Sequence, residues 1–274
     1  MEDKNSPDLL LGKHTPVVDE YSPQLLYPIP RSEGRNRLGL TPPLPFAGVD
    51  LWHAYEMSWL DSTGKPVVRV GRFTIPANSL NMVESKSFKL YLNSLNNTRF
   101  SDEEKARAVI VGDVSAVTGA EVTLELCEAN ALSLVGAELD GVCLDELPIN
   151  VSCEEPDSQL LRIRGAQVQE EQVYSHLLRS LCPVTGQPDW ATVWIHYRGV
   201  ALEHSSLLQY IVAYRQHQEF HEQCVERMFN DIYARVAPEF LHIQAFYTRR
   251  GGLDINPLRS TDALATALPR LNRQ

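Results

Sequence analysis

The first half of the chain contains two β-rich runs with a helical segment between them. The β-rich runs are VVRVGRFTI at 67–75 and AEVTLELCE at 120–128, and the second of these alternates like a strand. The helical segment is SDEEKARAVIVGDVSAVTG at 101–119, which opens with a Ser-x-x-Glu capping box. These patterns predict a mixture of strands and helices in this half.

The same order of elements returns in the second half, after an acidic, proline-punctuated stretch at 144–159. A β-rich run, WATVWIHYRG, occupies 190–199, and EFLHIQAFY at 239–247 alternates like a strand. Between them lie two stretches with helical spacing, LLQYIVAYRQ and FHEQCVERMFNDIYARV. The recurrence points to an internal repeat.

Short matches between the halves support this repeat. TGKP at 63–66 aligns with TGQP at 185–188, and FSD at 100–102 aligns at nearly the same shift with FHE at 220–222. The matches come in the same order and in the same structural context. We therefore predict two tandem copies of one β-β-α-α-β-β-like module.

The two halves carry complementary chemistry. The second half has Cys182 where the first has Leu60. The first half has the charged stretch ESKSFKLY at 84–91, which we align with the apolar residues 211–214 of the second half. Each half keeps what the other lacks, which favours a single site built from both halves.

Residues 1–48 are rich in proline, which blocks helices and central strands alike. We predict an irregular lead-in there. The expected organisation is therefore this lead-in at 1–48, an N-terminal module at 49–150 and a C-terminal module at 151–274.

Length, charge and cysteine use narrow the class of protein. The 274 residues suit two domains of ordinary size, about 100–150 residues each. The formal net charge of −10 repels a phosphate backbone, so a nucleic-acid partner is not expected. Neither a membrane span nor a signal-peptide pattern is present, and the five cysteines form no C-x-x-C pair. We expect a cytoplasmic protein without a membrane partner.

Cys182 is the first candidate for chemistry. It precedes Pro183 in SLCPVTGQPDW, a turn-rich approach to a strand, which places the thiol on an accessible loop. Asp189 closes the same turn, so the thiol and the carboxyl group can face one pocket. A cysteine there can attack an electrophilic carbon while the acid donates a proton. The simpler alternative is a small buried cysteine and an ordinary turn aspartate.

A polar cluster lies in the helical stretch that follows. His217 and His221 have i, i+4 spacing and could form a metal pair on one helix face, but the zinc-protease motif H-E-x-x-H is absent. Glu222 is better suited to accept two N–H donors from a planar heterocycle. For His217, ordinary solvent-facing polarity is the simpler interpretation.

Two basic segments could hold phosphate groups. One contains Lys86 and Lys89 in ESKSFKLYLNS, which a plain amphipathic helix explains equally well. The other is RRGG at 249–252, for which a polar turn is the simpler alternative. The chain contains neither the Rossmann nor the P-loop glycine motif.

Four motifs together closely resemble the long-chain, unimodular form of the QueF family, the NADPH-dependent 7-cyano-7-deazaguanine reductases. They are SLCPVTGQPDWATVWI, ESKSFKLYLNS, EFHEQC and RRGGLDINP, and the likeness runs from about Leu51 to Arg259. The resemblance implies an α+β fold of two tandem tunnelling-fold (T-fold) modules, each an antiparallel β-sheet backed by two antiparallel helices. It also implies a homodimer that makes 7-aminomethyl-7-deazaguanine for queuosine, a modified tRNA base, and consumes two NADPH per nitrile.

The resemblance assigns roles to individual residues. Cys182 would add to the nitrile carbon and form a covalent thioimide, Asp189 would donate a proton, and His221 would assist proton transfer. The substrate contacts it implies are Val83, Glu84, Ser85, Phe220, His221 and Glu222. The NADPH contacts it implies are Ser85, Lys86, Arg250 and Gly251, and no metal is expected.

Two alternatives keep other functions open. One is a zinc-dependent hydrolase related to GTP cyclohydrolase, with Cys182, His221 and Cys224 around the metal. The other is a non-catalytic oligomeric binding module in which the thiol and the acids are incidental.

Overall fold

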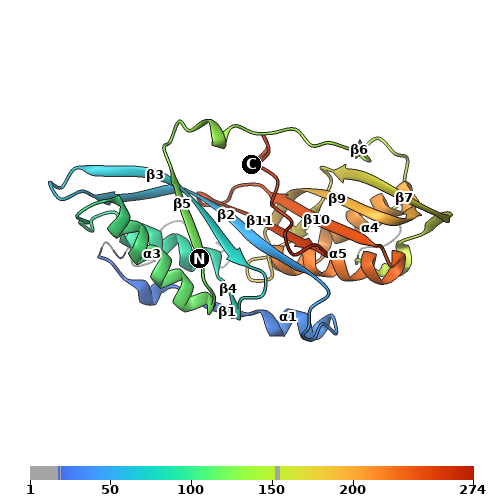
Figure 1. Ribbon diagram of the computed structural model, residues 1–274, viewed down its shortest axis with the longest axis horizontal. Helices are drawn as coiled ribbons and strands as arrows, with labels where there is room; N and C mark the ends of the chain where they lie inside the picture. Colours follow the sequence, from blue (N-terminus) through green and yellow to red (C-terminus); the bar gives the residue numbers. More distant parts are fainter. Residues whose placement is uncertain (1–17, 19, 152–154) are drawn as a thin grey trace, which may run out of the picture.

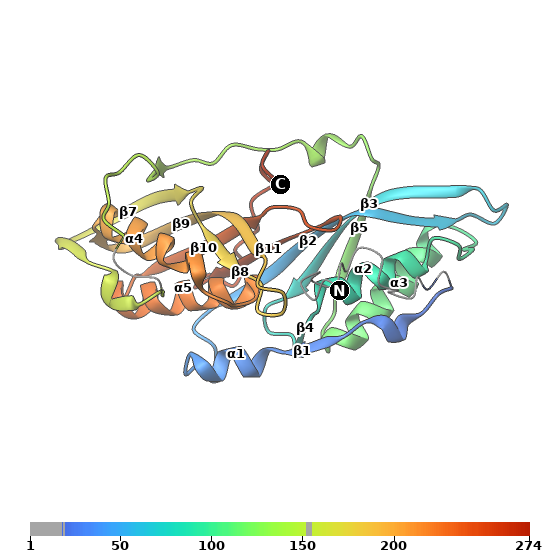
Figure 2. The same ribbon diagram turned by 180° about the vertical axis from the view of Figure 1, so that it is seen from behind.

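The described residues form a mixed α+β structure built on one large sheet. The computed structural model describes residues 18, 20–151 and 155–274. Figures 1 and 2 show the long helices on one face of this sheet. No helix in these ranges is long and apolar enough to cross a membrane.

The sheet is continuous from one half of the chain to the other. Its strand order is β5-β3-β2-β11-β10-β9-β7-β6, with β8 paired to β9. Neighbouring strands are antiparallel except β6 and β7, which are parallel. The strands of the sheet are β2 (Ala47–Leu60), β3 (Pro66–Pro76), β5 (Thr123–Cys127), β6 (Val142–Cys143), β7 (Ile163–Ser175), β8 (Arg179–Leu181), β9 (Pro188–Leu202), β10 (Phe240–Tyr247) and β11 (Leu253–Ser260).

Four of the five described α-helices come in two consecutive pairs, one pair in each half of the chain. The α-helices are α1 (Arg31–Arg37), α2 (Ser85–Ser94), α3 (Glu103–Thr118), α4 (His204–Ala213) and α5 (His221–Val236). The short ones are β1 (Pro28–Pro30), β4 (Asn81–Val83), η1 (Pro23–Leu25), η2 (Leu132–Leu134), η3 (Ser158–Leu160) and η4 (Tyr214–Gln216). Strands β1 and β4 form a separate two-stranded sheet.

Two hydrophobic cores lie between the helices and the sheet. One packs α2 and α3 on β2 and β3 around Trp52, Phe73 and Phe88, whose rings meet edge to face. The other packs α4 and α5 on β7, β9 and β10. Strand β11 pairs with both β2 and β10 and so joins the halves, and its Leu253 and Ile255 belong to the first core.

A crossing segment and the C-terminal residues lie over the sheet face opposite the helices. After β5 the chain crosses to β6 at the far edge of the sheet, along the top of both views in Figures 1 and 2. Ala137 on this crossing segment forms a bridge with Leu271 near the C-terminus. Leu271 packs with Trp194 and Phe246 in a third, small cluster. The first half thus differs from the predicted β-β-α-α-β-β order. After α3 only β5 joins the sheet next to β3, and the chain then crosses to β6 instead of forming a second strand there.

The helix pairs repeat a hydrogen-bonded pattern. Glu84 is the N-cap of α2, and Ser87 Oγ donates to its carbonyl over 2.7 Å; Ser206 Oγ donates to the carbonyl of Glu203, the N-cap of α4, over 2.8 Å. Tyrosines at matching positions then donate to an aspartate of the second helix: Tyr91 to Asp113 and Tyr210 to Asp231. The predicted alignment of 84–91 with 211–214 is therefore wrong, because EHSSLLQY at 203–210 occupies the equivalent positions.

Three further local predictions need correction. The lead-in is not wholly irregular in its described part, because β1 and α1 form where Pro30 immediately precedes a helix of seven residues. Residues 1–17 and 19 lie outside the described residues. The N-cap of α3 is Asp102, not Ser101, since the Asp102 carboxylate accepts from Lys105 N over 2.7 Å. His217 lies outside α5, which begins at His221, so the two histidines do not share a helix face.

Candidate active site

The β8–β9 hairpin carries Cys182 and Asp189. Cys182 immediately follows β8, donates its N–H to the Gln187 carbonyl over 2.9 Å, and accepts from Gly186 N over the same distance. Asp189 is paired with Ser180 across the hairpin. Cross-strand partners share a face, and so do residues two apart on a strand, so the Cys182 and Asp189 side chains project from one face. The thiol is partly exposed and the carboxyl is buried.

Asp189 is held between the imidazole of His221 and the guanidinium of Arg250. Its Oδ2 lies 3.3 Å from His221 Nε2, and its Oδ1 accepts from Arg250 Nη1. Burial of Asp189 opposes ionisation, but the hydrogen bonds and charges of His221 and Arg250 outweigh it and hold its pKa below the ordinary value. In this arrangement Asp189 is a carboxylate in the free protein, so to act as the predicted proton donor it must first take up a proton.

His221 is fixed on the other side by an aromatic ring. It is the first residue of α5, and its imidazole stacks on Tyr247 with ring centroids 3.7 Å apart and planes 11° apart. Its Nδ1 is buried without a hydrogen-bond partner among the described residues. Phe220, the N-cap residue, is partly buried just before it. The ring is therefore locked in place with one nitrogen left for a ligand.

Glu222 is a buried carboxyl group that favours its neutral form. It is 4% exposed, and no hydrogen bond joins its carboxyl to another described residue. Burial, reinforced by the negative charge of Asp50, raises the pKa of Glu222 to about 7. Near neutral pH this group can therefore accept N–H donors as a carboxylate at little cost.

A buried charge network fixes α5 against the first half of the chain. Arg259 is fully buried and binds Asp50 on β2 over 2.8 Å and Glu226 on α5 over 2.9 Å. Arg35 of α1 binds the same Glu226 over 2.7 Å, and Arg31 binds Asp50 over 2.5 Å. Because Glu226 lies one helical turn after Glu222, the network sets where Glu222 points.

The predicted cofactor residues lie on two neighbouring elements. Ser85 and Lys86 begin α2 and are exposed, and Arg250 and Gly251 occupy the turn between β10 and β11. Lys89 of α2 connects the elements, because a Cβ added at Gly251 would lie 3.2 Å from Lys89 Cδ. The structure therefore brings together two segments that are far apart in the sequence.

Two predicted substrate residues are already engaged by the protein. The Val83 side chain is buried in the first core. The Glu84 carboxylate accepts from Lys86 N over 2.9 Å and from Ser87 N over 2.6 Å, capping α2. Neither contact excludes a ligand at the backbone of this segment.

Comparison with known proteins supplies the family. Residues 17–126 match a model described as "Nitrile reductase, 7-cyano-7-deazaguanine-reductase N-term", and residues 188–265 match one described as "QueF-like protein". A curated relative from Dechloromonas aromatica (strain RCB), named "NADPH-dependent 7-cyano-7-deazaguanine reductase", is 55% identical over 254 residues. That alignment covers 92% of this chain and 89% of the relative. The chain belongs to the QueF family.

A solved structure of a QueF-like protein is only distantly similar. It is the "archaeosine synthase QueF-Like in the apo form", with a TM-score of 0.31 and 16% identity over 38% of this chain and 100% of that chain. A match at this level supports no conclusion about the site.

Sequence reasoning missed residues that shape the site of this QueF family member. Tyr247, Gln187 and Arg259 lie in ordinary strand and turn patterns, and nothing local marks them as partners of His221, Arg250 and Glu226. Trp190, next to Asp189, is another residue that sequence patterns did not single out. The guanidinium carbons of Arg179, Arg215 and Arg273 lie within 5.9 Å of its ring centroid, and none of the three pairs with a carboxylate of the described residues. Such a cluster suits an anionic ligand.

The ligands of the alternative zinc site are not gathered. Cys224 is fully buried, and burial raises the pKa of its thiol well above the ordinary value. Among the described residues, no group of possible metal ligands includes Cys182, His221 and Cys224. This arrangement gives the zinc hydrolase hypothesis no support.

Proposed function

We propose that this QueF family member reduces the nitrile group of 7-cyano-7-deazaguanine to an aminomethyl group with NADPH as reductant. The observation that carries the proposal is the placement of Cys182 and Asp189 on one face of the β8–β9 hairpin, with His221 on Asp189. The name of the 55% identical relative supports the substrate and the cofactor.

Glu222 is suited to bind the substrate base. A guanine-like ring presents an N–H and an amino group side by side, and a carboxylate accepts both. Burial deprives the Glu222 carboxylate of hydration and raises its pKa to about 7. The N–H groups of the bound base would supply the hydrogen bonds that the buried carboxylate lacks. Glu222 therefore recognises the ring while His221, the preceding residue, lies towards Asp189.

Covalent attachment begins at Cys182. Its sulfur bonds to the nitrile carbon, one π bond of the nitrile breaks, and the nitrogen takes a proton to give a thioimide. Asp189, ionised in the free protein, accepts the thiol proton and passes it to that nitrogen. The locked ring of His221 keeps the Asp189 carboxylate aimed at the reacting group.

Reduction then proceeds in two stages, for which bound NADPH supplies hydride. After the first reduction the C–S bond breaks, the Cys182 thiolate leaves, and an imine remains. The second reduction gives the amine, so each nitrile consumes two NADPH. Between the two stages the imine must be kept away from water. The burial of Asp189 and Glu222 is consistent with a site that excludes water.

The residues at the predicted cofactor positions fit a dinucleotide phosphate. Lys86 and Arg250 present exposed cations, and Gly251, at φ +57°, lets a ligand approach the backbone closely. Arg250 also binds Asp189, so the same cation lies where the cofactor and the reacting group meet.

The finer architecture is part of the proposal. We assign a lead-in at 1–48, one T-fold module at 49–150 and a second at 151–274, supported by the repeated Glu, Ser, Tyr and Asp pattern of the helix pairs. The homodimer and the cytoplasmic location stay predictions.

A direct assay tests the function. Purified protein is mixed with 7-cyano-7-deazaguanine and NADPH, and both loss of reduced cofactor and product mass are followed. We expect two NADPH consumed per 7-aminomethyl-7-deazaguanine formed. A protein that binds the nitrile but consumes no cofactor would overturn the proposal.

A further inference from the structure

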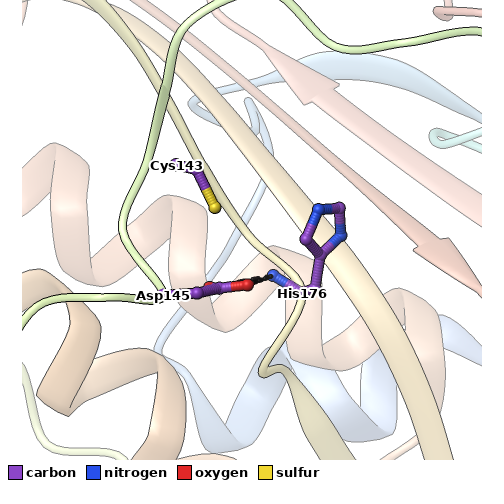
Figure 3. A group of neighbouring side chains, drawn as sticks. All are labelled: Cys143, Asp145 and His176. Atoms are coloured by element: carbon purple, nitrogen blue, oxygen red, sulfur yellow. Dashed lines mark hydrogen bonds between the residues drawn. The ribbon is translucent and has the colours of Figure 1, made fainter.

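We propose that Cys143, Asp145 and His176 form a zinc(II) site on the sheet face opposite the helices. One possible ligand atom from each residue lies within 4.8 Å of the others, and this is the group of possible metal ligands found among the described residues. Figure 3 shows the Cys143 sulfur pointing towards the Asp145 carboxylate, with His176 beside them. The site is separate from Cys182 and does not depend on the proposed reaction.

The backbone places the three residues together rigidly. Strand β6 runs parallel to the end of β7, with Cys143 opposite Tyr174, and Leu144 N donates to the Tyr174 carbonyl over 2.9 Å. Leu144 is fully buried between Cys143 and Asp145. Residues two apart in extended chain share a face, so both ligands point away from Leu144, and His176 stands on the neighbouring chain.

Buried hydroxyl groups orient two of the ligands. Ser175 Oγ donates to Asp145 Oδ1 over 2.7 Å, and Thr192 Oγ1 lies 2.8 Å from His176 Nδ1. Both hydroxyl residues are at most 1% exposed. The Thr192 contact occupies Nδ1, so we assign Nε2 as the metal-binding nitrogen, in the tautomer that carries its proton on Nδ1. Outer contacts of this kind are typical of metal-binding histidines and carboxylates.

The donor set selects the metal. Thiolate, imidazole and carboxylate together suit zinc(II), whereas magnesium and calcium prefer oxygen alone. One thiolate and one carboxylate neutralise the charge of the ion. His176 and Thr192 also line a cavity of about 450 Å³, which leaves room for water beside the imidazole.

Metal binding would fasten the crossing segment to the strands that lead into the active-site hairpin. Cys143 and Asp145 lie at the end of the crossing, and His176 lies just before β8. We expect a structural role, with thermal stability raised by zinc and basal turnover kept in its absence.

Cobalt(II) and zinc(II) titrations of the chelator-stripped full-length protein test the site. We expect one tight equivalent of zinc and, with cobalt, the charge-transfer absorption of a thiolate ligand. Cys143→Ser should abolish the absorption, and His176→Gln should weaken zinc binding by about tenfold or more. Cys182→Ser is the matched control with another accessible thiol, and it should bind as the parent does.

The outcomes are decisive because both substituted residues are exposed and their loss opens no core cavity. Circular dichroism confirms that each variant is folded. No tight equivalent in the parent protein, or unchanged cobalt absorption in Cys143→Ser, would overturn the proposal. Loss of binding in Cys182→Ser alone would place the metal at the active site and overturn it equally.

Discussion

Arg250 binds Asp189 across the space between the β10–β11 turn and the β8–β9 hairpin. The contact joins a residue expected to meet the cofactor to the residue expected to move the proton. With His221 on its other oxygen, Asp189 is kept ionised, as a group that first accepts the thiol proton should be.

Removing Arg250 should change the pH dependence of covalent attachment. In Arg250→Ala the pKa of Asp189 rises, because a stabilising cation is lost. The acid limb of the adduct rate, which follows ionised Asp189, should therefore move to higher pH. Adduct formation requires no NADPH, so mass spectrometry with the nitrile alone measures the effect. Arg249→Ala, which removes the neighbouring guanidinium stacked on Tyr55, should leave the limb in place. An unmoved limb in Arg250→Ala would contradict the assignment.

The thiol of Cys182 should be indispensable. Cys182→Ala should yield no covalent adduct and no detectable NADPH consumption, because no other nucleophile replaces the sulfur. Intact-mass measurement and cofactor absorbance report the two effects, and the unfolding temperature should stay near that of the parent. Cys143→Ala, at an exposed thiol elsewhere, should still form the adduct. Turnover by Cys182→Ala would show that the reaction bypasses the thioimide.

Glu222 should couple substrate affinity and stability to pH. Its pKa rises on folding from 4.5 to about 7, so the stability it contributes is fully present below pH 4.5 and is lost as pH rises towards and through 7. Chemical unfolding of the free protein should show this decline, and Glu222→Gln should flatten it.

The same variant tests recognition. Glu222→Gln should weaken binding of 7-cyano-7-deazaguanine by about 1–3 kcal/mol, since the amide cannot accept both donors of the base. Calorimetry should also show that parent affinity increases with pH through 7 as Glu222 ionises. Equal affinity of parent and variant would place the ring elsewhere.

Breaking the buried charge network should cost far more than breaking a surface pair. Arg259→Met leaves Asp50 and Glu226 with less compensation and should lower the free energy of unfolding by about 3–5 kcal/mol. Arg198→Met removes an exposed partner of Glu239 and should cost about 0–1 kcal/mol. Urea titration measures both. Similar losses in the two variants would mean that the network does not hold α5.

Local patterns in the sequence predicted several of the regular elements. Strand β9 and helices α3 and α5 lie where their periodicity placed them, because one face of each is buried and the spacing of apolar residues records it. The turn before β9 also placed Cys182 beside a strand, as found.

Elements governed by neighbours were harder to predict. Helix α1 forms in a proline-rich segment because Arg31 and Arg35 bury their charges against Asp50 and Glu226, which are distant in sequence. The counterpart of Glu84 was missed because Glu203 shares its N-cap position and extended backbone, but neither its side-chain cap nor the lysines that follow it.

The sequence by itself determined the mixed α+β class, several strands and helices, and the motifs that mark the family. Only the tertiary structure decided which side chains meet: Arg250 with Asp189, Tyr247 with His221, and His176 with Cys143 and Asp145. The physical reason is that periodicity records which face of an element is buried. Contacts between distant segments depend on strand pairing across the whole sheet, which local spacing does not encode.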